Sequence, residues 1–417
     1  MRRSAILGWR RAVVTLAGLW AAGCGSDGPT DWELATPLFD PDRVLLVDIE
    51  MAPADWDTLR QQTRTLEDLF GRPNCMDSPW PDPFTYFPAT VTVDGEPLTD
   101  VMVRKKGFIG SLDTDKPSLK ISMNEIDPEG RYLGLEKMTL NNSVQDGSYV
   151  NQCVTYDLFA RAGMPAPRCN FAHVTVNGAD LGVYVHVESM EDALMEGLFG
   201  DASGNLYEGT LSDFRPGWTG TFEKKNNRSE ADWSDLDAVV AAAAAEDDAL
   251  IAALEEVIDL DQFIRFWALE AIVRHWDGYA GNSNNFWIYR DGERFQFLPW
   301  GTDQVLADRN PVQGNDAPTS IYASSLLPWR LLQLEEGRAR YEAALRALLD
   351  EVWDEAALLA ELDRIQALIA PHVASGEVAE PIDRRRSFIS ERRAELLAEL
   401  EDGLPGWNFG LRQPVCR

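Results

Sequence analysis

The sequence is poor in basic residues and, after its first 24 residues, has no hydrophobic run long enough to predict a transmembrane helix. It contains 38 Lys and Arg against 68 Asp and Glu in 417 residues, which gives a formal net charge of −30 at pH 7. Proteins that bind nucleic acid through its phosphates need a basic face, so this charge argues against nucleic acid as a partner. The length is sufficient to bury a large core, in one domain or two.

Cysteine is also scarce, with five residues in the chain. Apart from Cys24, the cysteines are Cys75, Cys153, Cys169 and Cys416. Their spacing matches no zinc motif, and an even number in an exported chain favours two disulfides, for which three pairings are open. One of these, Cys153 with Cys169 and Cys75 with Cys416, would tie a helix to the next strand and pin the C-terminal tail to the N-terminal region.

The first 24 residues have the pattern of a bacterial export signal. Four arginines precede a short apolar stretch at residues 12–20, and the small residues 21–23 lead to Cys24. A Cys after Ala-Gly resembles the lipobox of bacterial lipoproteins, although Ala21 stands where Leu is usual. We predict an exported lipoprotein of the bacterial cell envelope (outer membrane or periplasm-facing), lipidated at Cys24, with this anchor as its sole membrane contact and a tether over residues 25–40. Ordinary signal cleavage nearby is the alternative.

The most informative stretch is residues 272–303. Its first half brings together one His, one Asp and three Asn within eleven residues: His275, Asp277, Asn282, Asn284 and Asn285. An apolar helical pattern over residues 259–274 precedes it, and two predicted strands joined at Asp291-Gly292 follow it. Asp303 comes just after the second strand.

This order of residues matches a protein-kinase catalytic loop, His-x-Asp-x4-Asn, followed by two strands and a metal-binding Asp. By that pattern Asp277 is the catalytic base, and Asn282 and Asp303 are metal ligands. His275 joins the catalytic group, where orienting the loop by hydrogen bonding is favoured over proton transfer. Asn285 either binds metal or holds the loop backbone.

Further segments between residues 40 and 310 strengthen the likeness. They lie at residues 103–107, 116–121, 161–167, 176–188 and 205–209. Together with the catalytic block, they resemble the CotH kinases, atypical secreted or surface protein kinases named for a spore-coat protein H. The resemblance implies an α+β, two-lobed atypical protein-kinase-like fold. Its β-rich N-terminal lobe would span residues 41–190, its mainly helical C-terminal lobe with a helical extension residues 191–404, and a tail residues 405–417.

The resemblance also implies a nucleotide site at residues 103–123. Gly107 and Gly110 flank a turn whose backbone N–H groups would approach phosphates. Lys120, on an alternating strand, would hold the phosphates as a point charge. Lys116 is the rival for that role, and Arg104 is a further phosphate candidate.

Two features of the predicted N-terminal lobe stay open. Residues 148–162 are predicted to form the helix in the place of a kinase αC, but this segment has no Glu to pair with the lysine. Glu188 ends a strand that in a kinase leads to the hinge, so it lies near the nucleotide or is a capping or surface residue.

Other segments carry structural expectations only. Residues 53–65 are predicted to form a helix, and the five prolines of residues 66–88 predict a long irregular loop. Residues 234–257 read as one alanine-rich helix, and residues 326–400 as three or four amphipathic helices.

Three functions follow from these patterns. The first is an exported kinase that uses ATP with Mg²⁺ or Mn²⁺ to phosphorylate Ser or Thr of an envelope or surface protein. The second is a catalytically inactive, kinase-like surface or binding lipoprotein. The third is a metal-dependent hydrolase or a Ca²⁺-stabilised surface protein. One departure bears on the choice: residues 300–303 read Trp-Gly-Thr-Asp where the family usually has Trp-Asp-x-Asp, so one carboxylate is missing.

Overall fold

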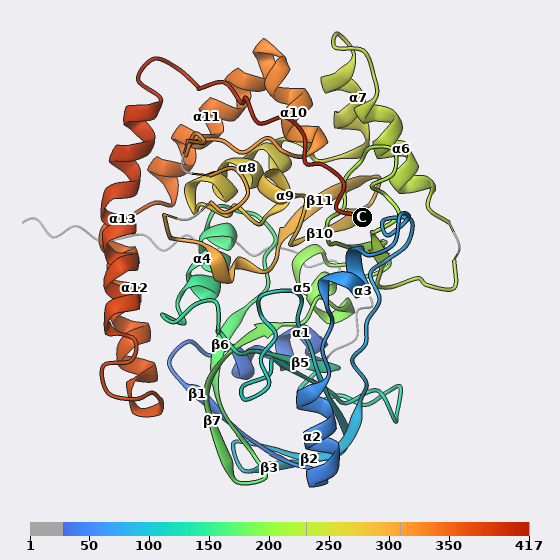
Figure 1. Ribbon diagram of the computed structural model, residues 1–417, viewed down its shortest axis with the longest axis vertical. Helices are drawn as coiled ribbons and strands as arrows, with labels where there is room; N and C mark the ends of the chain where they lie inside the picture. Colours follow the sequence, from blue (N-terminus) through green and yellow to red (C-terminus); the bar gives the residue numbers. More distant parts are fainter. Residues whose placement is uncertain (1–27, 231, 309, 315, 417) are drawn as a thin grey trace, which may run out of the picture.

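The computed structural model describes residues 28–230, 232–308, 310–314 and 316–416. The expected export signal and Cys24 lie outside these residues. The described chain is mixed α/β, with a β-barrel formed mainly before residue 190 and helices around a small sheet after it (Figure 1). Among the helices described, none is long and apolar enough to cross a membrane.

Seven strands close the barrel in the order β1-β2-β3-β4-β5-β7-β6. They are β1 (Val44–Glu50), β2 (Phe87–Val93), β3 (Glu96–Lys105), β4 (Leu119–Ser122), β5 (Lys137–Asn141), β6 (Cys169–Val176) and β7 (Ala179–Glu188). Neighbouring strands are antiparallel except β1 and β6, whose parallel pairing closes the barrel. Alternate residues of β1 are buried, namely Leu45, Val47 and Ile49, as the period of two in a strand requires.

The segments around the barrel correct three expectations. Of the tether predicted over residues 25–40, residues 31–34 form a short helix, α1 (Asp31–Leu34), and η1 (Thr36–Phe39) packs against the barrel, with Leu38 buried. The helix predicted at residues 53–65 ends earlier, as α2 (Pro53–Gln61). A short helix, α3 (Leu66–Phe70), stands within the proline-rich segment.

The reason for α3 is a capping box at its start. Thr65 Oγ1 accepts the backbone N–H of Asp68, and the Asp68 carboxylate accepts the N–H of Thr65. These reciprocal bonds satisfy N–H groups that a helix start leaves free, so a helix forms despite the prolines that follow.

The second half of the chain surrounds a four-stranded sheet of order β11-β10-β8-β9. Its strands are β8 (Leu206–Gly209), β9 (Glu223–Lys224), β10 (Phe286–Asp291) and β11 (Arg294–Pro299). The helices are α4 (Asn151–Arg161), α5 (Asp192–Phe199), α6 (Ser234–Ala243), α7 (Leu250–Val257), α8 (Leu260–Ile272), α9 (Tyr279–Asn282), α10 (Leu326–Gln333), α11 (Glu335–Glu351), α12 (Glu355–Ile369) and α13 (Ala379–Glu399), with 3-10 turns η2 (Thr302–Gln304) and η3 (Ala370–His372). The hairpin β10–β11 and the four helices α10–α13 confirm the expectations for those segments.

The single helix expected at residues 234–257 is in fact two, α6 and α7. The Arg330 guanidinium donates to the carbonyl oxygens of Ala243 and Ala245, both at 2.7 Å, and to Asp247 at 3.1 Å. These bonds satisfy carbonyl groups that the end of α6 leaves free, so tertiary contact ends the helix where alanine alone would continue it.

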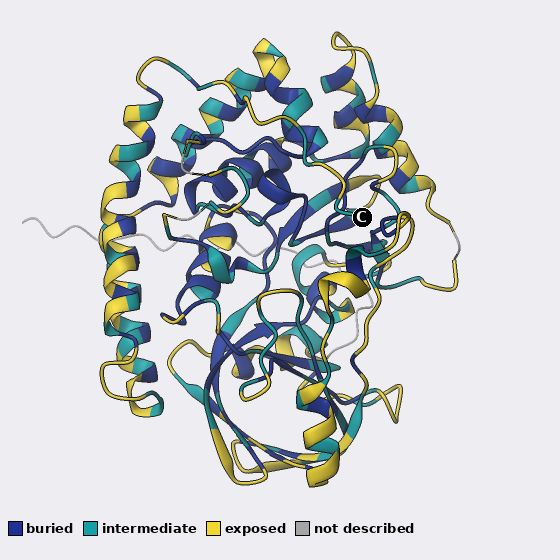
Figure 2. Ribbon diagram, in the orientation of Figure 1, coloured by how far each residue is buried: buried dark blue, intermediate teal, exposed yellow. Residues whose placement is uncertain are grey.

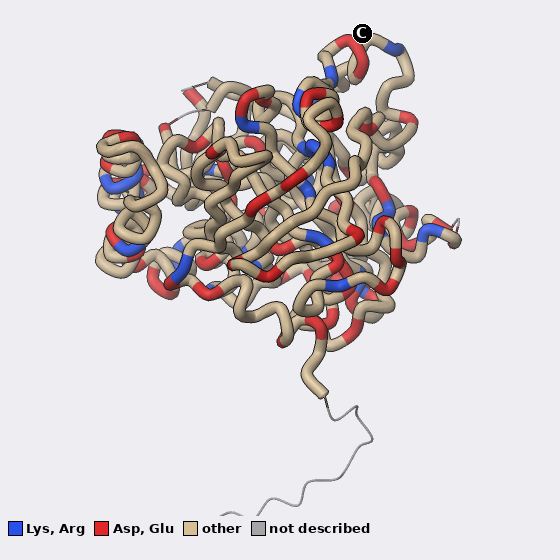
Figure 3. The backbone as a smooth tube through the Cα atoms, turned by 90° about the horizontal axis from the view of Figure 1, so that it is seen from below, with Lys and Arg blue, Asp and Glu red and all other residues tan. Residues whose placement is uncertain are grey.

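The main core lies around α8, which is buried along nearly its whole length (Figure 2). Phe263, Phe266 and Trp267 are fully buried there, and each such side chain contributes about 1.5–3 kcal/mol relative to exposure. By contrast, α13 alternates buried and exposed residues, and acidic residues are spread along the chain instead of gathering at one end (Figure 3). Because α8 leads directly into residues 273–285, that loop begins at the end of a buried helix of the main core.

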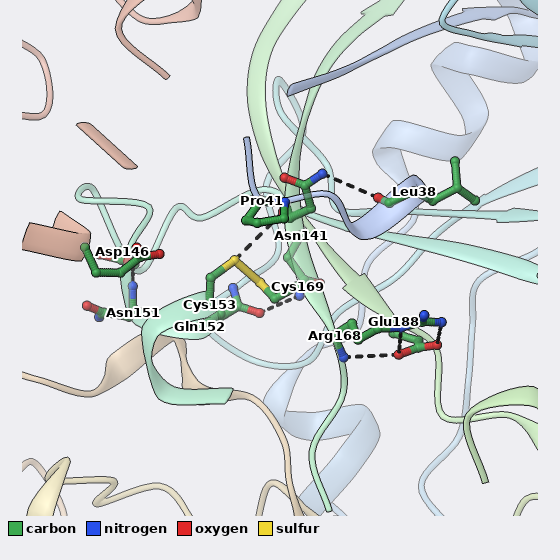
Figure 4. Close-up of a disulfide and its surroundings, with 12 residues drawn as sticks. Leu38, Pro41, Asn141, Asp146, Asn151, Gln152, Cys153, Arg168, Cys169 and Glu188 are labelled. Carbon is green, nitrogen blue, oxygen red and sulfur yellow. Dashed lines mark hydrogen bonds and ion pairs between the residues drawn. A yellow bond between two sulfur atoms is a disulfide. The ribbon is translucent and has the colours of Figure 1, made fainter. Parts of the chain in front are cut away.

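Both disulfides of one expected pairing are present. Cys153–Cys169 joins α4 to β6 across 16 residues, and Cys75–Cys416 joins the proline-rich segment to the C-terminal tail across 341 residues. Figure 4 shows the first of these beside the end of the barrel.

Candidate active site

A cavity of about 930 Å³ lies where the barrel meets the helical region. The barrel lines it with Arg104, Lys106 and Lys120, and the loop after α8 lines it with Asp277 and neighbouring asparagines. A large cleft with few convergent polar groups is the usual form of a ligand site. The cavity therefore unites the two segments that the sequence assigned to one site.

The loop is anchored from behind by Glu270 of α8. Its Oε1 accepts the N–H of Tyr279 at 2.8 Å, its Oε2 accepts the N–H of Ala280 at 2.9 Å, and its carbonyl oxygen accepts the N–H of His275 at 2.7 Å. Burial raises the pKa of Glu270 to about 8, although the two N–H donors lower it. The sequence analysis missed this residue, whose one signal was a carboxylate inside an apolar helix.

The close contact between the loop and Glu270 requires a glycine at position 278. A Cβ added there would lie 2.1 Å from Glu270 Oε1, closer than any real contact. The backbone can therefore approach the Glu270 carboxylate only without a side chain at this position.

His275 orients the loop and does not line the cavity, which corrects its place among the catalytic residues. The side chain is fully buried, and its Nε2–H donates to the Trp300 carbonyl oxygen at 3.1 Å. Burial lowers the pKa of His275 to about 4, so the ring is neutral near pH 7. It ties the loop to the end of β11, the strand that leads to Asp303.

Asp277 faces the cavity and is held by three side-chain amides. Its Oδ1 accepts from Asn282 Nδ2 at 2.6 Å and from Asn284 Nδ2 at 3.1 Å, and its Oδ2 accepts from Asn285 Nδ2 at 2.9 Å. Burial raises the pKa of Asp277, and the three amides oppose this. The carboxylate is thus fixed in orientation. Asn282 Oδ1 is the amide atom that can bind a cation, and in this structure it accepts from Arg412 Nε at 2.7 Å.

Asp303 lies on η2 beside Asp277. Its backbone oxygen accepts from Asn151 Nδ2 of α4 at 2.6 Å, which fixes the turn. Burial, together with the negative charges of Asp277 and Asp146, raises the pKa of Asp303 to about 7. A carboxylate next to like charges is stabilised by a cation, and oxygen ligands such as Asp303 and Asn282 suit Mg²⁺ or Mn²⁺.

At position 301, where the family usually has Asp, the Asn285 side chain occupies the space that a side chain would need. Gly301 has φ +55°, and a Cβ there would lie 2.5 Å from Asn285 Cγ. Asn285 thus fills the space next to Gly301 and donates to Asp277, which is the loop-holding role of the two considered for it.

On the barrel side, strand register brings cations together. Arg104 of β3 lies directly opposite Lys120 of β4, and both face outward to the cavity. Burial lowers the pKa of Lys120 to about 7, although the charge of Glu191 raises it. Like charges opposite each other on neighbouring strands are unfavourable. Arg104 is ion-paired with Asp82 at 3.0 Å, whereas no ion pair is found for Lys120 in the described part of the chain, so an anion in the cavity would stabilise Lys120 above all.

Lys106 is a site residue that the sequence analysis did not single out. Its Nζ donates to Asn141 Oδ1 at 2.5 Å, burial lowers its pKa to about 8, and the charge of Asp303 raises it. Alternation could have found it, because Arg104 and Lys106 share one face while Lys105 points away and donates to the Arg60 carbonyl oxygen at 2.7 Å.

Three of the expected nucleotide residues, Lys116, Glu188 and Gly110, lie outside the cavity lining. Lys116 Nζ contacts the Tyr149 hydroxyl at 3.0 Å and lies over the Tyr149 and Tyr184 rings. Glu188 is buried and paired with the Arg168 guanidinium (Figure 4), so it is neither near the nucleotide nor a surface residue. The charge of Glu188 is neutralised by Arg168, and the Lys116 amine is held by the two tyrosines.

The two glycines of the predicted phosphate-binding turn differ in their position relative to the cavity. Gly107 lines the cavity with φ +130°, a conformation that favours glycine. Gly110 does not line it, and a Cβ there would lie 2.6 Å from Gln145 Nε2. Of the pair, Gly107 alone is placed to bring backbone N–H groups near a ligand.

Taken together, the cavity combines an oriented carboxylate, a second carboxylate with a nearby amide oxygen, and several cations. Such a set can accept a proton, hold a divalent cation and neutralise a polyanion. These are the requirements of phosphoryl transfer.

Known proteins are similar to this chain in sequence. The inner spore coat protein H of Bacillus subtilis is 23% identical over 287 residues, which cover 62% of this chain and 76% of that protein. The invasin CotH7 of Rhizopus delemar is 23% identical over 274 residues, which cover 58% of this chain and 44% of the invasin. The chain thus spans less than half of the invasin's length.

Solved structures show more distant likeness. The Helicobacter pylori proinflammatory kinase CtkA has a TM-score of 0.35 at 9% identity, covering 68% of this chain and 94% of that one. The HipA complex of the Shewanella oneidensis toxin–antitoxin system has a TM-score of 0.28 at 13% identity, covering 74% of this chain and 64% of that one.

The profile of the family described as CotH kinase protein matches residues 103–380, which is more than half of the chain and includes both sides of the cavity. This chain therefore belongs to the CotH kinase protein family.

Proposed function

We propose that this protein is an exported protein kinase that transfers the γ-phosphoryl group of ATP to a Ser or Thr hydroxyl of a protein substrate. The observation that carries the proposal is the opposition of charges in one cavity. Asp277 and Asp303 lie on one side, and Lys106 and Lys120 lie on the other. Family membership supports the same reaction class, since kinase-like folds place these residue types around a nucleotide.

In this proposal Asp277 accepts the proton of the attacking hydroxyl. The hydroxyl oxygen bonds to the γ-phosphorus, the bond from that phosphorus to the β-phosphate oxygen breaks, and ADP leaves. Asn282 and Asp303 would hold Mg²⁺ or Mn²⁺, which neutralises charge on the β- and γ-phosphates when bound. Lys120 and Lys106 bind phosphate oxygens as point charges, and Gly107 allows backbone N–H groups to approach them.

The direct test is incorporation of labelled phosphate from ATP with Mg²⁺ or Mn²⁺. The full-length protein is compared with Asp303→Ala and with Asp308→Ala, a matched change at an exposed carboxylate that pairs with Arg274. We expect labelling that is lost in Asp303→Ala and kept in Asp308→Ala. Equal labelling in both variants would refute the metal role of Asp303, and no labelling of the wild type with any protein would refute the kinase.

An inactive, kinase-like surface or binding protein is the second candidate. Gly301 favours it, because this position carries no carboxylate for a metal and Asn285 fills the space. Under this alternative the wild type binds ATP without transferring phosphate, so a binding measurement alongside the labelling experiment separates the two.

We further propose that the protein is exported and lipid-anchored through Cys24, with an envelope or surface protein as its substrate. Two disulfides are typical of exported chains and support the first part. Labelled fatty acid should enter the wild-type protein in cells and fail to enter Cys24→Ser. Incorporation in both would show that Cys24 is not the lipid site.

A further inference from the structure

The C-terminal tail returns to the cavity after the last helix. Figure 1 shows the tail crossing from α13 to a point beside β10 and α3. Arg412 lines the cavity there, and its Nε donates to Asn282 Oδ1 at 2.7 Å. This arginine lies beyond residues 103–380, which the family profile covers.

Bonds on both sides of Arg412 hold it in place. Its own N–H donates to the Ser324 carbonyl oxygen at 2.7 Å, and its carbonyl oxygen accepts from the Arg215 guanidinium. Four residues later, Cys416 is bonded to Cys75 and packs in a small apolar cluster with Trp218. The guanidinium is therefore a built part of the cavity wall.

The basic residues of the cavity differ in whether a carboxylate neutralises them, and Arg412 is among those that lack one. Most of them have a carboxylate partner within 4 Å; these are Arg64 and Arg104 with Asp82, Lys137 with Glu191, Lys225 with Glu208, and Arg228 with Glu223. Over the described ranges of the chain, Lys106, Lys120 and Arg412 have none. Cations without a carboxylate in a partly buried site are stabilised by an anionic ligand.

The Arg412 guanidinium also has unused donors. Nε is bonded to Asn282, and within the described residues no side chain or carbonyl accepts from Nη1 or Nη2. A guanidinium has five N–H donors in a planar fork that matches a phosphate group. When Asn282 Oδ1 serves as a metal ligand, Nε loses its acceptor, and a phosphate oxygen is the natural replacement.

We propose that Arg412 is a phosphate-contacting residue, carried into the site by the disulfide-tethered tail, that binds the transferred phosphoryl group of ATP. Arg412 is next to Asn282, which bonds Asp277, so it meets the end of the triphosphate nearest the base. Lys106 and Lys120 then neutralise the phosphates from the barrel side. This inference rests on the proposed nucleotide site but not on turnover.

The experiment measures the affinities of the full-length protein for Mg²⁺·ATP and Mg²⁺·ADP by calorimetry. We expect Arg412→Gln to weaken ATP binding about tenfold and to leave ADP binding within about twofold, because ADP lacks the group that Arg412 contacts. Arg412→Lys should lose less, since it keeps the charge without the planar fork. Arg384→Gln is the matched control, because it removes the same group from an exposed position of α13 that is ion-paired with Glu380 and lies outside the cavity lining, and it should leave both affinities unchanged.

The Cys75–Cys416 disulfide, which holds the C-terminal tail, has its own test. Cys75→Ser/Cys416→Ser keeps Arg412 but frees the end of the tail, so it should reduce ATP affinity several-fold while ADP affinity is kept, which also reports an intact fold.

Three outcomes overturn the inference. Equal ATP affinity in the wild type and Arg412→Gln would do so while leaving the proposed function standing. Tighter ATP binding in Arg412→Gln would mean that Arg412 competes with the metal for Asn282. Wild-type protein that binds neither nucleotide would overturn the proposed function and the inference together.

Discussion

The two sides of the cavity hold their charges in different ways. On the loop side, three amides bind Asp277, and the loop itself is bonded to Glu270. On the barrel side, Lys120 has no ion-pair partner in the described chain, and strand register alone sets it opposite Arg104. One side is a single hydrogen-bonded unit, and the other is a set of cations that have no common partner.

This difference indicates how each side would respond to change. A unit of coupled hydrogen bonds fixes a carboxylate within the narrow geometry that catalysis needs, so single substitutions there should be severe. Separate cations act through charge, and losing one leaves the others in place. Changes on the barrel side should therefore be smaller and should appear in binding more than in turnover.

The largest expected effect is at the centre of the loop side. Asp277→Asn removes the proton acceptor while keeping size, so phosphate transfer should fall about 1,000-fold, or about 4 kcal/mol in transition-state stabilisation. ATP affinity should change little, since Asp277 contacts the hydroxyl. Labelling and calorimetry on one preparation check this, with Asp308→Asn as the matched control. A parallel loss of ATP affinity would show that Asp277 binds the nucleotide.

The next effect concerns α4, which joins the two sides. Its Asn151 holds the backbone of Asp303, and its Cys153 is bonded to Cys169 of β6. Cys153→Ser/Cys169→Ser opens a loop of 16 residues, and the free energy of unfolding should fall by about 3 kcal/mol. Chemical denaturation monitored by circular dichroism measures this. An unchanged midpoint would mean that packing alone holds α4 to the barrel.

The barrel side should lose affinity in smaller steps. Lys106→Met and Lys120→Met each remove one phosphate-binding charge, so ATP affinity should fall about tenfold to a hundredfold in each variant. Lys116→Met is the matched control, because Lys116 contacts Tyr149 outside the cavity lining and should leave affinity unchanged. An equal loss in all three would mean that general charge, and not position, attracts the nucleotide.

The smallest effect is a pH dependence of the barrel itself. His186 of β7 is fully buried and stacked on Phe39, and burial together with the charge of Arg168 lowers its pKa to about 4 from 6.5. Its contribution to stability is present above pH 6.5 and is lost as the pH falls toward 4, because the unfolded chain takes up the proton first.

His186→Phe keeps a ring and removes this titration. Between pH 7 and pH 5 the wild type should lose about 2 kcal/mol more than the variant in free energy of unfolding. His275 titrates in the same direction but is present in both proteins, so it cancels from the difference. A variant with the same acid sensitivity as the wild type would show that His186 is protonated in the folded state.

The two sides of the cavity also differ in how well local sequence patterns predict them. The positions of Asp277, Asn282 and Asp303 in one cavity were predicted, because the loop, hairpin and trailing Asp are contiguous and local spacing sets their geometry. On the barrel side the candidates Lys116, Glu188 and Gly110 lie outside the cavity lining, and Lys106 was missed. Which face of a strand meets the cavity depends on pairing with distant strands, which local patterns leave undetermined.

The sequence by itself determined the alternating strand that carries Lys120, the buried helix α8, the hairpin after the loop and the family. Each of these depends on periodicity, turn residues or spacing within a short segment. Only the tertiary structure decided that Glu270 anchors the loop, that Glu188 pairs with Arg168, and that Arg412 reaches Asn282 from the far end of the chain. These contacts join residues whose approach depends on the packing of the whole chain, because long-range partners are selected by burial and charge in three dimensions and not by local pattern.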